Sequence, residues 1–425
     1  MYSRLAASYL GAGVWAAAFV LSACRASESA DSADSSVAVA TLDSLSSPAA
    51  TGSSVPNLFV AADGRVLMSW IEPAPDSAQA LKFSVLDSPS SVKSTWSAPR
   101  TIAQGKNFLV NWADFPSIIA LPDGRLAAHW LERIPGGKYS YIVRVPQSRD
   151  GGQSWSPPVS PHRDDSPTEH GFVSLFPAAG DSLGAVWLDG RAFATAQSDS
   201  GKEMQLLQTT LAPDNSLGAE RRLDSRICDC CQTSMALTAR GPVVVYRDRS
   251  PDEVRDISIL RLVDGNWSAP RRVHADDWRI DFCPVNGPAV SAHGDTVAVA
   301  WFTGSRDTAR VQAIFSFDGG QTFGQAVRVD GGMPEGRVDV VLDNRGRALV
   351  SWVERTGGEN AEVRVRRVSP GGTMSEPMSV ATSSAGRASG FPRMVAAGTD
   401  LIFAWTVPGT PSVVRVARAR LDYSD

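Results

Sequence analysis

The chain has 425 residues and a formal net charge of −4, from 41 Lys and Arg residues against 45 Asp and Glu residues. This near balance excludes the strongly basic surface with which proteins bind nucleic acids or anionic lipid headgroups. The 36 Gly, 27 Pro and 12 Trp residues suit a protein of many short strands and tight turns, and all-β chains of this length often form a single domain.

The first residues are expected to be a targeting segment rather than part of the fold. Arg4 precedes the apolar stretch Leu5–Ala23. The tetrapeptide Leu21-Ser22-Ala23-Cys24 resembles a bacterial lipobox, which implies cleavage before Cys24 and lipidation of its thiol. An uncleaved transmembrane anchor is the alternative, because about 20 apolar residues can span a bilayer.

These features predict three segments along the chain. Residues 1–23 would be a lipoprotein signal peptide, residues 24–36 a flexible tether rich in Ser, Ala and Asp, and residues 37–425 the folded domain. Arg25, directly after the lipidated cysteine, resembles the sorting pattern of outer-membrane lipoproteins. We therefore expect an extracytoplasmic protein that is anchored to the bacterial cell envelope and meets the membrane only through its lipid.

A repeat organises the rest of the sequence. An apolar strand, a Gly turn and a second strand that ends near an aromatic residue recur at intervals of 51 to 60 residues. A third strand follows, and often a fourth, so that each repeat has the strands of one β-propeller blade. The repeated aromatic residues are Trp70, Trp130, Trp187, Tyr246, Trp301, Trp352 and Trp405.

Seven repeats predict an all-β fold, a single propeller of seven four-stranded blades. The last repeat lacks an outer strand after Val413–Leu421, and the segment Val37–Leu45 can supply it. Pairing these two segments would close the ring and remove an exposed sheet edge.

Two segments resemble the Asp box of the sialidase (neuraminidase) superfamily. Residues 148–155 and 316–323 both match S-x-D-G-G-x-[S/T]-[W/F]. The resemblance implies structural turns on the rim of a propeller, away from substrate, and because known sialidases have six blades it makes six the alternative count. The residues with these structural roles would be Asp150, Gly152, Trp155, Asp318, Gly320 and Phe323.

In a propeller, the loops before the inner strands and after the second strands surround one mouth of the central channel, where ligands commonly bind. Arginines are frequent in these loops and indicate an anionic ligand, because the guanidinium group matches a carboxylate. Internal salt bridges are the alternative. The candidate ligand-binding residues are Asp114, Arg133, Glu169, His170, Arg191, Arg247, Arg249, Asp281, Asn286, Arg337 and Arg393.

The four cysteines of the folded domain, Cys228, Cys230, Cys231 and Cys283, all lie at the starts of blades four and five. A disulfide between Cys283 and one of the other three is favoured outside the cytoplasm, because bridging Cys230 to its neighbour Cys231 would be strained. A copper or zinc site with His170 as a further ligand and free redox-active thiols are the alternatives.

The sialidase resemblance implies three converging arginines, a Tyr nucleophile with a carboxylate partner and an Asp acid/base. The sialidase Arg-Ile-Pro motif is missing, since blade two has Asp114-Phe115-Pro116 in its place, and Tyr246 occupies a core position of the repeat. We therefore expect a module that binds an anionic small molecule, a glycan or an envelope protein. An exo-sialidase is the second hypothesis, and copper or zinc handling through the cysteines is the third.

Overall fold

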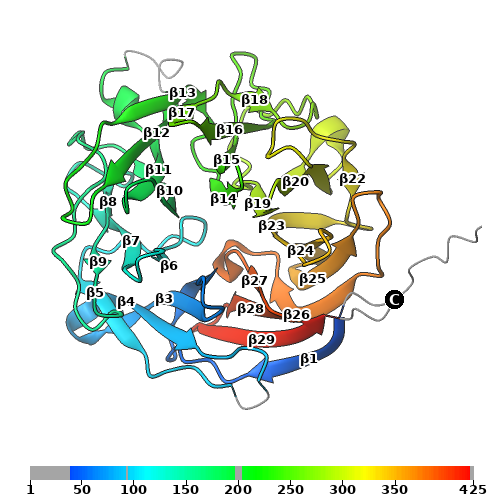
Figure 1. Ribbon diagram of the computed structural model, residues 1–425, viewed down its shortest axis with the longest axis horizontal. Helices are drawn as coiled ribbons and strands as arrows, with labels where there is room; N and C mark the ends of the chain where they lie inside the picture. Colours follow the sequence, from blue (N-terminus) through cyan, green and yellow to red (C-terminus); the bar gives the residue numbers. More distant parts are fainter. Residues whose placement is uncertain (1–38, 92–93, 197–202, 422–425) are drawn as a thin grey trace, which may run out of the picture. The chain divides into compact units, whose positions relative to one another are not determined.

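The computed structural model describes residues 39–91, 94–196 and 203–421. These residues form an all-β ring of seven blades, whose strands follow one another around the central axis in chain order (Figure 1). The seven-bladed propeller predicted from the repeat is confirmed, and the six-bladed alternative is not found. The expected signal peptide, Cys24 and the tether lie outside the described residues.

The blades share one strand order, from the channel to the rim, and each strand is antiparallel to the next. The inner strands are β2 (Ser54–Val60), β6 (Ser117–Ala120), β10 (His170–Pro177), β14 (Ser234–Thr238), β19 (Ala289–His293), β23 (Pro334–Leu342) and β27 (Arg393–Ala397). The second strands are β3 (Val66–Ala74), β7 (Leu126–Arg133), β11 (Leu183–Asp189), β15 (Gly241–Arg247), β20 (Thr296–Thr303), β24 (Ala348–Gly357) and β28 (Asp400–Val407).

The third strands are β4 (Ala78–Leu86), β8 (Tyr141–Arg144) continued by β9 (Gln147–Ser148), β12 (Met204–Leu211), β16 (Ile257–Val263), β21 (Arg310–Ser316), β25 (Asn360–Val368) and β29 (Val413–Leu421). The outer strands are β5 (Arg100–Gly105), β13 (Arg221–Ile227), β17 (Asn266–Trp267) with β18 (Arg271–Arg272), β22 (Val327–Arg328), β26 (Met378–Ser384) and β1 (Val39–Leu45). In blade two, the outer position is held by a bridge between Val145 and Val159. Short 3₁₀ helices lie in the connections: η1 (Pro75–Ser77), η2 (Arg191–Ala194), η4 (Ser305–Asp307) and η5 (Arg387–Ser389).

The repeated aromatic residues are buried between neighbouring blades, which explains their spacing. Trp187, for example, is fully buried and packs with Leu131 of blade two. Its indole N–H donates to Asp189 Oδ2 at 2.8 Å, two residues further along the same strand. Residues two apart lie on the same face of a strand, so the acid can satisfy the buried N–H group, as buried Trp requires.

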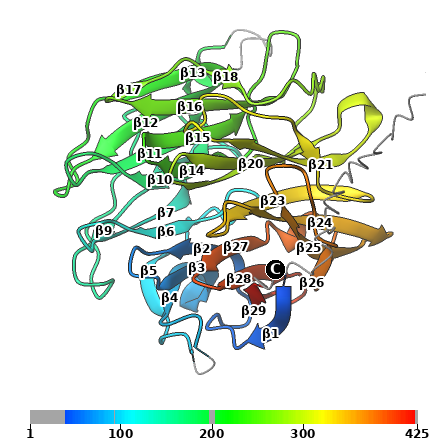
Figure 2. The same ribbon diagram turned by 45° about the vertical axis from the view of Figure 1, so that its right-hand side comes forward.

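The ring closes where the sequence predicted. Strand β1 pairs antiparallel with β29, with Leu42 opposite Ala419 and Leu45 opposite Val416 (Figures 1 and 2). The predicted closing strand began at Val37, whereas β1 begins at Val39, and residues 37 and 38 lie outside the described part of the chain. The seventh blade therefore contains strands from both ends of the domain.

Both segments that resemble Asp boxes form the same turn. Asp150 Oδ1 accepts the amides of Gln153 and Ser154 at 2.9 Å, and Asp318 Oδ1 accepts the amides of Gln321 and Thr322 at 2.9 and 2.7 Å. The second Gly of each pair has a positive φ. It lies against a side chain of the preceding blade, so a larger residue would not fit. Each turn follows the third strand of its blade, after β9 in blade two and after β21 in blade five.

Within the described ranges, no helix is both long and apolar enough to cross a bilayer.

Candidate functional site

The loops before the inner strands and after the second strands gather at one side of the ring, as the sequence predicted. Each inner strand starts beside the end of the second strand of its blade, as the pairs His170–Asp189 and Pro334–Glu354 show. The polar residues before the inner strands and after the second strands therefore share one mouth of the channel.

Two of the candidate arginines are buried and hold backbone carbonyls rather than face the channel. Arg247 is 1% exposed and donates to the carbonyls of Asn286, Arg255 and Phe302 at 2.9, 2.6 and 2.7 Å. Arg337 is 4% exposed and donates to the Ala385 carbonyl at 2.8 Å. Burial lowers the pKa of Arg337 to about 10, so the side chain stays protonated at neutral pH.

The other candidate arginines also have partners within the chain. Arg191 forms a paired contact with Asp189 and Glu220, with N–O distances of 2.7 and 2.8 Å. The remaining contacts are Arg249 with Glu253 at 2.8 Å, Arg393 with Asp339 at 3.4 Å, and Arg133 with the Lys138 carbonyl at 3.3 Å. Arg191, Arg249 and Arg393 thus form the internal salt bridges that the sequence left as the alternative to an anion site. Arg247, Arg337 and Arg133 donate to backbone carbonyls instead.

A pocket of about 260 Å³ opens at the mouth between blades two, three and four. Two aromatic residues of its wall are Trp112 and the exposed Tyr139. Arg133, Lys138, Glu169 and Asp229 supply charged groups, and Cys230 also lines it. We call this the tyrosine pocket, because Tyr141 lies at its base.

Tyr141 contacts Glu169 in this pocket. The phenol donates to Glu169 Oε2 at 3.3 Å, and the two residues also form a parallel backbone bridge that fixes their relative position. Burial, aided by the negative charge of Asp229, raises the pKa of Glu169 to about 7. Burial and the same acids raise the pKa of Tyr141 well above its usual value, so the phenol remains a donor.

Asp114 lies close to this pair, because its carboxyl group and the Tyr141 ring both lie against Gly171. Its Oδ2 accepts the Phe172 amide at 2.9 Å, and burial raises the pKa of its carboxyl group to about 7. A Cβ at Gly171 would lie 2.2 Å from that oxygen, so only glycine leaves room for the carboxyl group there. Three acids, Asp114, Glu169 and Asp229, therefore act on one phenol.

Sequence reasoning selected Asp114 and Glu169 as candidates but did not select Tyr141. Its position at the very start of β8 was the available signal, because the third strand of a blade begins at the same mouth where the second strand ends. The contact with Glu169 of the next blade depends on how the blades stack, which the sequence pattern does not reveal.

The remaining candidates have other surroundings. His170 is fully buried, with Nε2 3.0 Å from Asp164 Oδ2, and its ring stacks on His162 at 4.0 Å. Asn286 Oδ1 accepts the Arg337 amide at 2.7 Å. Asp281 is exposed and lines a separate pocket of about 770 Å³ beside Asn286. His170 therefore lies in a group with acids, and the cysteines have Asp229 as their acidic neighbour instead.

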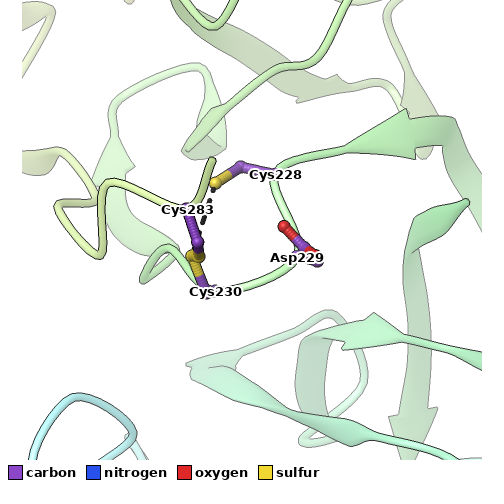
Figure 3. A group of neighbouring side chains, drawn as sticks. All are labelled: Cys228, Asp229, Cys230 and Cys283. Carbon is purple, nitrogen blue, oxygen red and sulfur yellow. Dashed lines mark hydrogen bonds between the residues drawn. A yellow bond between two sulfur atoms is a disulfide. The ribbon is translucent and has the colours of Figure 1, made fainter. Parts of the chain in front are cut away.

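The cysteines lie between these two pockets. A disulfide joins Cys230, which lines the tyrosine pocket, to Cys283, whose neighbours line the larger pocket (Figure 3). Cys228 and Cys231 are free and buried. Burial opposes ionisation of Cys228, but hydrogen bonds from Cys231 and the Cys230 amide, together with the charge of Arg247, leave its pKa below the usual value. A copper or zinc site that uses all of these sulfurs would require the reduced form, because a metal binds thiolates rather than a disulfide.

No model of a known protein family matches the sequence, and no curated protein matches it either. Solved structures share its fold. A protein of unknown function from Dyadobacter fermentans is 13% identical, over 91% of this chain and 99% of its own, with a TM-score of 0.52. Polysaccharide lyase Uly1 is 9% identical, over 86% and 89% of the two chains, with a TM-score of 0.51. The K499G mutant of NanB sialidase from Streptococcus pneumoniae is 13% identical, over 89% and 70%, with a TM-score of 0.43.

The raised pKa of Asp114 predicts a specific dependence of stability on pH. The folded state holds this proton up to about pH 7, whereas an unfolded Asp releases it near pH 4, so folding is favoured less as the pH rises between these values. Between pH 5 and pH 8 this loss amounts to about 3 kcal/mol, at roughly 1.4 kcal/mol per pKa unit.

The wild type should lose this stability between pH 5 and pH 8, and Asp114→Asn should not. The difference in unfolding free energy between the variant and the wild type should therefore rise by about 3 kcal/mol over this range. The Asn side chain still accepts the Phe172 amide, so the comparison isolates the charge. Chemical denaturation at the two pH values measures it, and parallel pH profiles of the two proteins would show that Asp114 is ionised in the folded state.

Proposed function

We propose that this propeller binds a saccharide in the tyrosine pocket and exchanges protons with it through Glu169 and Tyr141. The observation that carries the proposal is the Tyr141–Glu169 contact of 3.3 Å inside a pocket walled by Trp112 and Tyr139. Aromatic rings stack on the apolar faces of sugars, and carboxylates accept hydrogen bonds from their hydroxyl groups.

The pKa of Glu169 supports a role in proton transfer. An acid/base group works best when its pKa is close to the working pH, and that of Glu169 is about 7. A saccharide-binding module has no need of a carboxyl group that is half protonated at neutral pH. Proton transfer to a leaving oxygen is the step that glycosidic cleavage requires. We therefore infer acid–base processing of a glycan, with Asp229 as the second carboxyl group of the pocket.

The test is a panel of oligosaccharides of different composition, followed by calorimetry for binding and by mass spectrometry for products. Glu169→Gln keeps the shape of the side chain, so we expect it to retain binding and to lose turnover by about 100-fold or more. Glu220→Gln, whose partner Arg191 lies in the same blade, is the control and should leave both unchanged. Binding without turnover would support the saccharide site and overturn the proton-transfer role, and absence of binding would overturn the whole proposal.

An aryl sialoside belongs in the same panel. We expect no efficient release of sialic acid from it, because the arginines that would hold its carboxylate are paired within the chain. Efficient release that is lost in Arg249→Ala would show instead that these pairs open for the substrate.

We also propose that the mature protein is lipid-anchored outside the cytoplasm, and the disulfide supports this because disulfides persist in oxidising compartments. Cys24→Ser should yield a chain that lacks the lipid and leaves the membrane fraction, or one whose signal peptide is not removed. Intact-mass measurement and membrane fractionation check this. The proposal would be contradicted if the variant had the same N-terminal modification as the wild type, by mass, and remained in the membrane fraction.

A further inference from the structure

A third sulfur lies in contact with the disulfide. Cys228 Sγ is 3.9 Å from Cys230 Sγ, and the Cys230–Cys283 bond lies directly beside it (Figure 3). Cys228 is 1% exposed, so solvent does not separate the three sulfur atoms. A thiolate in contact with a disulfide sulfur is the arrangement from which thiol–disulfide exchange starts.

The surroundings of Cys228 favour its thiolate. Nη1 of the buried Arg255 lies 3.7 Å from Cys228 Sγ, and the Cys228 amide donates to the Arg247 carbonyl at 3.0 Å, which fixes the backbone of this residue. The Arg255 guanidinium and the charge of Arg247 stabilise a negative sulfur. Burial and the charge of Asp229 oppose it, but on balance the pKa of Cys228 lies below its usual value. Inert structural cysteines, in contrast, have apolar surroundings.

We propose that Cys228, Cys230 and Cys283 form a thiol–disulfide relay at the mouth of the propeller. The Cys228 thiolate attacks Cys230 Sγ, a Cys228–Cys230 bond forms, the Cys230–Cys283 bond breaks, and its electron pair leaves with Cys283 as a thiolate. One thiolate and one disulfide are present before and after, so the exchange requires no oxidant or reductant.

The exchange transfers the reactive thiolate from the buried Cys228 to Cys283. Cys283 is partly exposed and follows Phe282, which is 70% exposed and lines the larger pocket. A released Cys283 thiolate can there attack an external disulfide, forming a mixed disulfide and releasing one thiol. Small disulfides or disulfide-bearing peptides are therefore the substrate class. This activity is independent of the saccharide site, although Cys230 also lines the tyrosine pocket.

The relay predicts which cysteine reacts in the folded protein. The full chain, without reductant, is treated with N-ethylmaleimide, quenched with acid and digested with trypsin. We expect the maleimide on Cys283, in peptide 280–306, and an internal Cys228–Cys230 disulfide in peptide 227–240. Oxidised glutathione in place of the maleimide should add one glutathione at Cys283. Modification of Cys228 and Cys231 alone, with the Cys230–Cys283 bond intact, would overturn the relay.

Variants separate the relay from local unfolding. Cys228→Ser and the apolar Cys228→Ala should lose Cys283 labelling entirely, whereas Cys231→Ser should keep it. Undiminished labelling of Cys283 in both Cys228 variants would overturn the proposal. Arg255→Met should slow labelling about threefold for each unit by which the Cys228 pKa rises, because the thiolate fraction falls tenfold while nucleophilicity increases. Arg249→Met is the matched control, since Arg249 shares the partner Glu253 but has no contact with Cys228 among those described.

Discussion

A chain that lacks β1 (Val39–Leu45) should be less stable by on the order of 5 kcal/mol and should self-associate. Deletion removes the backbone ladder with β29, in which each hydrogen bond contributes about 1 kcal/mol. It also removes the contact between Asp43 and Arg418 at 3.3 Å and exposes apolar groups against which Leu45 packs. The freed edge of β29 then offers unpaired backbone groups to another chain.

Chemical denaturation measures the loss, and gel filtration measures the association. Deletion of residues 25–36, which keeps Cys24 and lies before β1, is the control and should leave the unfolding free energy unchanged. If both deletions left the unfolding free energy and the elution volume unaltered, the closure by β1 would not contribute to the fold in solution.

The second large effect concerns Arg247, which the sequence suggested as a ligand-binding residue. Its guanidinium donates to three carbonyls from three separate segments and lies 4.9 Å from the Trp278 ring. Arg247→Met preserves much of the apolar stem but leaves the carbonyls without a donor, each at a penalty of about 1–3 kcal/mol. We expect the free energy of unfolding to fall by about 5 kcal/mol, whatever ligand is present.

Arg249→Met provides the comparison, because Arg249 lies two residues further on and pairs with the partly exposed Glu253. Glu253 keeps Arg226 and Arg255 as ion-pair partners in this variant, so we expect a smaller loss of stability than in Arg247→Met. Chemical denaturation of the two variants distinguishes the roles. Equal, small losses of stability in both would mean that Arg247 does not hold these segments together.

The fold was predictable because its signals are local and repeated. The aromatic residues of the second strands recur once per blade, and each blade meets the same packing requirement as its neighbours. The missing outer strand of the last blade was predictable for the same reason, since an incomplete repeat needs a partner strand.

The site was predictable only in part, because its contacts join segments that are far apart in the sequence. The sequence placed Arg191 and Arg247 at the mouth, but their partners Glu220 and Phe302 lie 29 and 55 residues away along the chain. The four cysteines allowed several pairings, and only the packing of the loop around Cys283 selects Cys230 over Cys228. Tyr141 acquires its role from Glu169 of the neighbouring blade.

The pairing of β1 with β29 also constrains the order of folding. The strand that is synthesised first has its only described strand partner in the last one, so the seventh blade cannot form until the whole domain has emerged. Contacts between residues so distant in sequence slow folding, because the ends must meet before any of their interactions contribute. Until then β1 and β28 each present an unpaired edge. Both edges can pair with another chain until the ring closes.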